Sequence, residues 1–226
     1  MGFLDDCIPP DGGCKAAIAA LAVVPPVNWF AGASMRGVRV GIAGYMGAGK
    51  STCARSFEPA GALVIDADAE AKRLMRGSVD ILDRLRRAFG DDVAGDGELR
   101  VEALGRAAFG SVDALRTLNG IVHPPLVGHL EALIVECVKP LCILDAALIP
   151  LWNIEPWFDL CVWIDAPFDT RLERIAAKGG GVDEREISRR MRMQEEVMGV
   201  PAGERWVRVP DGACREYIAG EINKRR

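Results

Sequence analysis

The sequence predicts an α/β fold in which helices cover both faces of a parallel β-sheet. Two observations predict this class. Short apolar runs with the length of buried strands alternate with stretches of helical periodicity, and a glycine-rich loop joins the first such run to a helix. Half of the 226 residues are apolar, which is enough to form a sizeable core. The formal net charge of −4 argues against a general nucleic-acid binder, which needs a basic surface.

Residues 1–36 differ in character from the rest and are expected to form an N-terminal extension. Their longest apolar run, Ala16–Val24, has nine residues, whereas a membrane-spanning helix needs about 20. Acidic residues outnumber the single Lys15 that precedes this run, unlike the positive start of a secretory signal. Two interpretations stay open: an extra helix packed on the domain, or a disordered extension ahead of a natural start at Met35.

The cysteines predict a reducing compartment. They are odd in number and scattered, which suits reduced thiols in the cytoplasm better than a disulfide framework. The seven are Cys7, Cys14, Cys53, Cys137, Cys142, Cys161 and Cys214. Their spacing does not match that of zinc ligands, and His123 and His129 lie apart from them. We therefore expect reduced thiols and no metal site built from thiolates.

The first predicted strand, residues 38–43, leads directly into a glycine-rich loop. Gly44–Ser51 fits the phosphate-binding template G-x-x-x-x-G-K-[ST] without a departure, and residues 52–57 have the pattern of a helix. Glycines allow consecutive backbone N–H groups to surround a polyphosphate, and the helix N-terminus adds partial positive charge. Lys50 is suited to reach the β- and γ-phosphates, and the Ser51 hydroxyl to bind a magnesium ion.

The match to this template is specific. In a chain of this composition its four fixed positions would arise by chance on the order of 0.003 times. The strand before the loop and the helix after it lower that figure further. The alternative of a merely structural glycine-rich turn therefore has little weight, and the sequence predicts a nucleotide site at this loop.

A second apolar run, residues 62–65, ends in an Asp-Ala-Asp segment. Asp66 and Asp68 leave this strand at the edge of the sheet where the phosphate loop also ends, which is where open α/β sheets bind ligands. A helix over residues 67–75 is expected to begin here with Asp66 as its N-cap. Two interpretations stay open: the aspartates take part in chemistry, or both only cap the helix.

The middle of the chain is predicted to be helical. Residues 79–89, 112–122 and 126–138 carry apolar residues at helical spacing, and the His-Pro-Pro segment 123–125 separates the last two helices. A histidine before proline is more often a hydrogen-bonded structural residue than a catalyst, so His123 has a structural interpretation beside any functional one.

Two further strands are predicted over residues 141–145 and 160–165. The first ends in Asp145, which is suited to hold magnesium indirectly. Because strands and helices alternate along the chain, these strands are expected to join the earlier ones in one parallel sheet.

Two basic stripes follow the fourth predicted strand and flank Gly179–Gly181. Within each stripe the basic residues recur at helical spacing, so each stripe lies along one side of a helix. The first contains Arg171, Arg174 and Lys178, and the second contains Arg185, Arg189 and Arg192. Such stripes are usually solvated helix faces. In a protein with a phosphate loop, two basic helices around a glycine hinge also fit a closing lid, and both interpretations stay open.

The ordered motifs resemble those of the dephospho-CoA kinase family over about residues 38–194. The phosphate loop alone identifies only the P-loop superfamily. The Asp-Ala-Asp segment, the mid-chain His-Pro and the Arg-x-x-x-Gln pattern, in matching order, single out this member. The matching residues are Gly44–Thr52, Ile65–Asp68, Phe89 and Gly90, Asp96 and Gly97, Leu99, Ala108 and Phe109, Leu118, His123 and Pro124, Ile164–Pro167, Arg174, Arg190 and Gln194.

The resemblance implies a three-layer P-loop NTPase fold with a parallel sheet, an inserted helical substrate-binding part and a helical lid. It implies transfer of the ATP γ-phosphate to the ribose 3′-hydroxyl of dephospho-CoA, the last step of coenzyme A synthesis, with Mg²⁺ as the metal. The N-terminal extension then precedes a kinase domain over residues 37–226. Its core comprises 37–75, 139–168 and 204–226, its helical CoA-binding part 76–138 and its lid 169–200.

The resemblance also assigns site residues. Asp68 corresponds to the carboxylate that orients or deprotonates the attacking hydroxyl, and Lys50 is the second catalytic residue. Arg174 and Arg190 correspond to lid arginines that bind ATP, and His123 lies near the acceptor. The ATP-binding set is Gly47, Ala48, Gly49, Lys50, Ser51, Thr52, Arg174 and Arg190, with Ser51 as the metal ligand.

The sequence departs from the family pattern in three places. The run 145–151 lacks the Pro-Leu-Leu-Phe-Glu-like segment expected after the third strand, and Glu155 is the nearest candidate to replace its glutamate. Lys178 stands at a lid position often held by arginine, and lysine cannot bind phosphate through a planar fork. Residues 209–212 replace an asparagine expected on the adenine side.

The expected partners are ATP and dephospho-CoA, for a monomer in the cytoplasm that uses neither nucleic acid nor a membrane. Two alternatives stay open: another small-molecule P-loop kinase of the nucleoside or nucleotide type, and a nucleotide-binding pseudokinase that acts through a partner. Retention of Lys50, Ser51 and Asp68 speaks against the pseudokinase.

Overall fold

The computed structural model describes residues 37–95, 97–108, 111–177 and 183–224. The expectations for the N-terminal extension, and for Lys178 with the glycine hinge, lie outside these residues.

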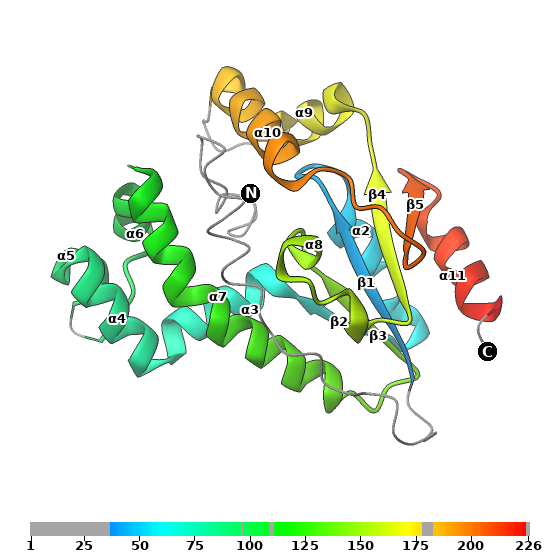
Figure 1. Ribbon diagram of the computed structural model, residues 1–226, viewed down its shortest axis with the longest axis horizontal. Coiled ribbons are helices and arrows are strands. Elements are labelled where there is room, and N and C mark those ends of the chain that lie inside the picture. The colour runs from blue at the N-terminus through cyan, green and yellow to red at the C-terminus, as the bar shows by residue number, and fades with distance from the viewer. Residues whose placement is uncertain (1–36, 96, 109–110, 178–182, 225–226) are drawn as a thin grey trace.

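Within the described residues, five parallel strands form one sheet in the order β2-β3-β1-β4-β5 (Figure 1). Their bounds are β1 (Val38–Gly44), β2 (Leu63–Asp66), β3 (Leu141–Asp145), β4 (Leu160–Asp165) and β5 (Trp206–Pro210). The four strands predicted from apolar runs are confirmed, whereas β5 was not predicted. Since β1 occupies the centre, the glycine-rich loop that follows it leaves from the middle of the sheet's carboxyl edge.

Side chains of β4 alternate between two cores, because successive residues of a strand point to opposite faces of the sheet. Cys161 and Trp163 belong to the larger core on one face, whereas Leu160, Val162 and Ile164 belong to a second core on the other face. All five are buried, as in strands that are covered on both faces. The predicted three-layer α/β fold is thereby confirmed.

The helices divide between the two faces and two outlying groups. The core that contains Leu160 also contains side chains of α2 (Lys50–Arg55) and α11 (Cys214–Lys224). The larger core packs against α3 (Ala67–Gly77), α4 (Val79–Phe89), α5 (Asp91–Ala94), α6 (Val101–Ala108), α7 (Val112–Val135), α8 (Ile149–Trp152) and the end of α10 (Glu184–Met198). Short 3₁₀ turns span Glu58–Ala60 and Glu155–Trp157.

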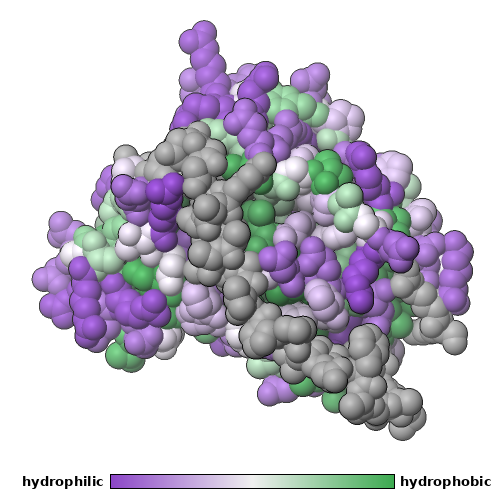
Figure 2. Space-filling view, viewed as in Figure 1, coloured by the Kyte–Doolittle hydropathy of each residue, from purple (hydrophilic) through white to green (hydrophobic). Residues whose placement is uncertain are grey.

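Two helical groups extend beyond the sheet. Helices α4–α6 and part of α7 form an arm on one side, and α9 (Phe168–Ala177) lies beside α10 above the carboxyl edge (Figure 1). Figure 2 shows hydrophilic residues crowded over both groups, at the top and at the lower left of the view. Among the described helices, none is both long enough and apolar enough to cross a bilayer.

Helix α7 runs without interruption through Pro124 and Pro125, so the predicted division into two helices is wrong. A proline inside a helix removes the N–H that would bond the carbonyl four residues earlier. For Pro124 that carbonyl belongs to Gly120, and it accepts a hydrogen bond from Nη2 of Arg84 at 3.4 Å. Helix α4 thus supplies a donor for one of the carbonyls that the prolines leave without a helical partner.

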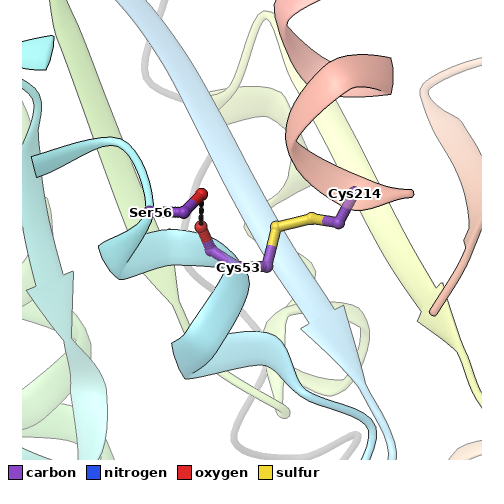
Figure 3. Close-up of a disulfide and its surroundings, with 3 residues drawn as sticks. All are labelled: Cys53, Ser56 and Cys214. Carbon is purple, nitrogen blue, oxygen red and sulfur yellow. Dashed lines mark hydrogen bonds between the residues drawn. A yellow bond between two sulfur atoms is a disulfide. The ribbon is translucent and has the colours of Figure 1, made fainter. Parts of the chain in front are cut away.

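A disulfide joins Cys53 in α2 to Cys214 at the start of α11 (Figure 3). The expectation of reduced thiols is therefore wrong for this pair, whereas the thiols of Cys137, Cys142 and Cys161 form no disulfide within the described residues. The two bonded residues are 161 positions apart in the sequence, but α2 and α11 contribute to the same core, and their Cα atoms are 6.0 Å apart. The spacing of cysteines along the chain could not reveal a contact that depends on how two distant helices pack.

Loss of this disulfide is expected to lower the free energy of unfolding by about 2–4 kcal/mol, because the crosslink closes a long loop and restricts the unfolded chain. The measurement is urea unfolding of the oxidised wild type, of the same protein with dithiothreitol, and of Cys214→Ser. Cys137→Ser is the matched control, since Cys137 is free. Equal midpoints for the wild type with and without reductant would contradict the prediction.

Candidate active site

The loop between β1 and α2 has a backbone suited to a polyphosphate. Gly47 and Gly49 have φ angles of 79° and 93°, in the left-handed region that glycine adopts without strain. A Cβ atom on Gly47 would lie 2.8 Å from the carbonyl oxygen of Arg171, so α9 packs directly against the loop. Ser51 and Thr52 are exposed in the first turn of α2, where backbone N–H groups have no partner within the helix. Their donors are therefore placed to bind an anion.

The Lys50 side chain turns back over this loop. Its Nζ donates to the carbonyl oxygen of Tyr45 at 3.1 Å, and the N–H of Ala48 donates to the same oxygen, also at 3.1 Å. The ammonium group therefore lies beside the loop backbone that a polyphosphate would contact.

Aspartates gather at the same edge of the sheet. Asp66 and Asp145 are register partners on β2 and β3, and Asp145 is also the partner of Ile42 on β1. Oδ1 of Asp66 accepts the N–H of Ala69 at 3.1 Å and caps α3, as predicted. Asp68 follows in the first turn of α3. The hydrogen bond that caps α3 is made by Asp66. The interpretation that both aspartates only cap the helix therefore does not explain Asp68.

Arg174 lies beside the phosphate loop and forms an ion pair with Asp211. A Cβ atom on Gly49 would be 3.5 Å from Oδ1 of Asp211 and 3.8 Å from Nη1 of Arg174. The pair therefore borders the N-terminus of α2. Asp211 directly follows β5 and was not among the predicted site residues, because its position depends on the alignment of β5 beside β4.

The Arg190 side chain forms an ion pair with a residue of its own helix, α10. Its Nε donates to Oε1 of Glu186 at 2.8 Å, and Arg189 binds the same carboxylate. These hydrogen bonds lower the pKa of Glu186 to about 2. The structure thus brings Arg174 to the loop and holds Arg190 in an ion pair within α10, and the role of both in ATP binding stays a prediction.

Arg171 is buried, with 2% of its surface exposed, so the solvated-face interpretation is wrong for this residue. Its guanidinium pairs with Glu195 on α10 and lies 5.0 Å from the ring centroid of Tyr45. Its Nε donates to the carbonyl oxygen of Ala166 at 3.0 Å. Helix α9, helix α10 and the phosphate loop therefore meet around one buried cation, which helical periodicity alone does not predict.

His123 lies in the interior, 3% exposed, and packs edge-to-face on Trp152 with ring centroids 5.6 Å apart. Within the described part of the chain neither of its ring nitrogens has a hydrogen-bond partner, unlike the hydrogen-bonded histidine of the structural interpretation. Burial disfavours the charged imidazolium and lowers the pKa of His123 to about 4. Its predicted place near the acceptor stays a prediction.

Burial of His123 is expected to make the protein less stable as the pH falls from about 6.5 to about 4. The unfolded chain binds a proton on this histidine below about pH 6.5, whereas the folded chain resists until about pH 4. The free energy of unfolding should therefore fall by up to about 3 kcal/mol through this window. Urea unfolding of the wild type and of His123→Phe between about pH 7 and 4.5 checks this. Equal pH dependence in the two proteins would refute it.

Glu155 lies at the opposite edge of the sheet. Its carboxylate accepts a hydrogen bond from the side chain of Trp206, which is the first residue of β5. Because β4 and β5 are parallel to β1, their starts lie at the edge away from the phosphate loop. Glu155 therefore does not replace the glutamate that is absent after β3.

A family model described as dephospho-CoA kinase matches residues 38–199, from the start of β1 to just past α10. The chain belongs to the dephospho-CoA kinase family. It is therefore a kinase, an enzyme that transfers a phosphoryl group. The match includes every site residue predicted from the sequence, and it ends before β5 and α11, so that Asp211 and Cys214 lie beyond it.

Individual dephospho-CoA kinases are similar to the chain over most of its length. The dephospho-CoA kinase of Methylococcus capsulatus is 36% identical over 142 residues, which make up 62% of this chain and 72% of that protein. The dephospho-CoA kinase of Porphyromonas gingivalis is 31% identical over 166 residues, 74% of this chain and 82% of that protein.

Solved structures share the fold. TT1252 from Thermus thermophilus has a TM-score of 0.66 at 25% identity, covering 84% of this chain and 98% of that one. Dephospho-CoA kinase from Campylobacter jejuni has a TM-score of 0.54 at 15% identity, covering 82% and 96%, and this likeness shows the fold alone.

Proposed function

We propose that this kinase transfers the γ-phosphoryl group of ATP to the ribose 3′-hydroxyl of dephospho-CoA, yielding ADP and coenzyme A in the last step of coenzyme synthesis. The observation that carries the proposal is the convergence of Lys50, Asp68 and Asp145 at one edge of the sheet, around an intact phosphate loop. The family match over residues 38–199 supports this donor and acceptor.

ATP binds with its phosphates along the loop. The backbone N–H groups of residues 47 and 49–52 face the phosphates at the N-terminus of α2, where the helix dipole also favours negative charge, while the N–H of Ala48 donates to the Tyr45 carbonyl. Lys50 keeps its hydrogen bond to the Tyr45 carbonyl and directs its remaining N–H donors at the β- and γ-phosphates. Arg174, which borders this turn in its ion pair with Asp211, is the second cation proposed to bind the phosphates.

Mg²⁺ is the metal that the polar groups of this edge fit. The Ser51 hydroxyl and the Asp145 carboxylate offer oxygen ligands, which Mg²⁺ prefers. Ser51 would bind the ion, and Asp145 would hold it through water. When bound, the ion supplies charge neutralisation to the β- and γ-phosphate oxygens.

Asp68 acts on the acceptor. The 3′-hydroxyl oxygen forms a bond to the γ-phosphorus while the bond from that phosphorus to the β–γ bridging oxygen breaks, and Asp68 accepts the hydroxyl proton. The Lys50 ammonium stabilises negative charge on the transferred group. ADP leaves with the electron pair of the broken bond.

The test is a coupled ADP-release assay with Mg·ATP and a panel of acceptors that includes dephospho-CoA, nucleosides and nucleotides. Turnover with dephospho-CoA, and mass-spectrometric detection of the 3′-phosphorylated product, is the expected result. Phosphorylation of a nucleoside but not of dephospho-CoA would assign the chain to another small-molecule kinase class. ATP binding without turnover on any acceptor would support the pseudokinase.

ATP and dephospho-CoA are the proposed partners of a cytoplasmic monomer without nucleic-acid or membrane partners. Light scattering of the purified protein tests the monomer, and localisation of a tagged full-length chain tests the compartment.

A further inference from the structure

The peptide unit between Tyr45 and Met46 is held from both sides. Its carbonyl oxygen, on Tyr45, accepts Nζ of Lys50 at 3.1 Å. Its N–H, on Met46, donates to Oε1 of Gln194 at 2.7 Å. Among the described residues no peptide bond is cis, so this N–H and this carbonyl point in opposite directions. Gln194 therefore fixes the direction in which the carbonyl that holds Lys50 points.

Gln194 is itself held firmly in α10. It is fully buried, and the next residue, Glu195, pairs with the buried Arg171 of α9. The Met46 side chain packs with Ile187 and Met191 of the same helix. Packing of α10 against α9 and the phosphate loop therefore fixes the position of the Gln194 oxygen, although Gln194 is far from the loop in the sequence.

The opposite orientation of this peptide is unfavourable as long as Gln194 is present. With the Gln194 amide in the orientation that the structure shows, rotation of the peptide by half a turn would point the Tyr45 carbonyl at Oε1, so that two acceptors would face each other in a buried place. It would also turn the N–H toward the Lys50 ammonium, where two donors would meet. Leaving buried polar groups without partners is costly, and without the glutamine acceptor much of that penalty disappears.

We propose that Gln194 is a positioning residue of the nucleotide site: it orients the Tyr45–Met46 peptide and thereby places Lys50 for the phosphates of ATP. This role rests on the proposed function, in which Lys50 binds the β- and γ-phosphates. It also gives a physical role to the glutamine of the Arg-x-x-x-Gln pattern. Helix α10 then belongs to the nucleotide site through the hydrogen bond between the Gln194 side chain and the backbone of the phosphate loop. This contact does not depend on any contact that Arg190 makes.

The test compares Gln194→Met, which has similar volume but no strong acceptor, with Val197→Ala on the same helix. Val197 is buried in the larger core and is not part of the cluster around Met46. For Gln194→Met we expect the Kd and the KM for ATP to rise about 10-fold, with the KM for dephospho-CoA changed less than about 2-fold. Val197→Ala should unfold at lower urea, with both KM values near those of the wild type.

A double-mutant cycle separates positioning from general loosening. In a Lys50→Met background, Gln194→Met should change the Kd for ATP less than about 2-fold, because the residue acts through Lys50. Should Gln194→Met fail to fold, Gln194→Glu at about pH 6 replaces it, since it keeps an acceptor oxygen and burial favours the uncharged carboxyl. Its Kd for ATP should stay within about 3-fold of the wild type.

Three results would overturn the inference: a normal Kd for ATP in Gln194→Met, an equal loss of affinity in the Lys50→Met background, or a 10-fold loss in Gln194→Glu. The Kd for ATP is measured by titration without acceptor. A wild type that binds ATP but does not phosphorylate dephospho-CoA would therefore refute the proposed reaction while still deciding the role of Gln194.

Discussion

Replacement of Asp68 by asparagine is expected to lower kcat by about 10²–10⁴-fold, the contribution typical of a positioned general base. Asparagine retains the size and polarity of the side chain but cannot accept the proton of the 3′-hydroxyl. The Kd for ATP should stay near the wild-type value, because Asp68 lies in the first turn of α3 rather than on the phosphate loop. Steady-state kinetics with Mg·ATP and dephospho-CoA, together with nucleotide titration, measures both quantities.

Asp66→Asn is the matched control for this variant. Asp66 lies two residues earlier, caps α3 and pairs with Arg55 at 3.2 Å. Asparagine is also a good N-cap, so Asp66→Asn should retain most of the wild-type kcat. If the two variants lost equal activity, the effect would belong to the start of α3 and not to the carboxylate of Asp68.

Lys50→Ala is expected to reduce kcat/KM for ATP by about 10²–10³-fold. This is the effect typical of losing one preorganised group that stabilises charge in the transition state. The Lys50 ammonium lies 3.1 Å from the carbonyl oxygen of Tyr45 in the phosphate loop. Alanine removes this charge without altering the glycines that shape the loop backbone. Initial-rate measurements over a range of ATP concentrations show the loss, and urea unfolding shows that the variant is folded.

Lys224→Ala serves as the control for charge. Lys224 is exposed near the end of α11 and pairs with Glu221 at 2.6 Å. Its removal changes the net charge by the same amount and should leave kcat/KM unchanged. Normal kinetics in Lys50→Ala would instead exclude the phosphate loop from catalysis.

Local patterns were sufficient to predict the centre of the fold. Strands β1 to β4 are short apolar runs that end in loops or aspartates, and β1 is followed at once by the phosphate template, so each could be read from neighbouring residues. The N-cap role of Asp66 is equally local, since it depends on one helix start. These features need no knowledge of which elements meet in space.

Features that depend on packing could not be predicted in the same way. Only Val209 of β5 is fully buried, since the strand lies at the edge of the sheet, and its sequence carries a weak strand signal. Helix α7 continues through its prolines with the help of Arg84 of α4, which donates a hydrogen bond to the Gly120 carbonyl. The sequence of α7 alone does not reveal this contact. Arg171 looked like part of a solvated stripe because helical periodicity cannot show that Glu195 and Tyr45 close around it.

The central position of β1 also bears on how the protein is made. Both neighbours of β1 in the sheet, β3 and β4, come from residues after 140, so the strand that carries the phosphate loop leaves the ribosome without a partner. At about 5–20 residues per second, roughly 6–24 s of translation separate the end of β1 from the end of β4. The nucleotide site is therefore completed late in synthesis, when β4 and the helices after it pack against β1.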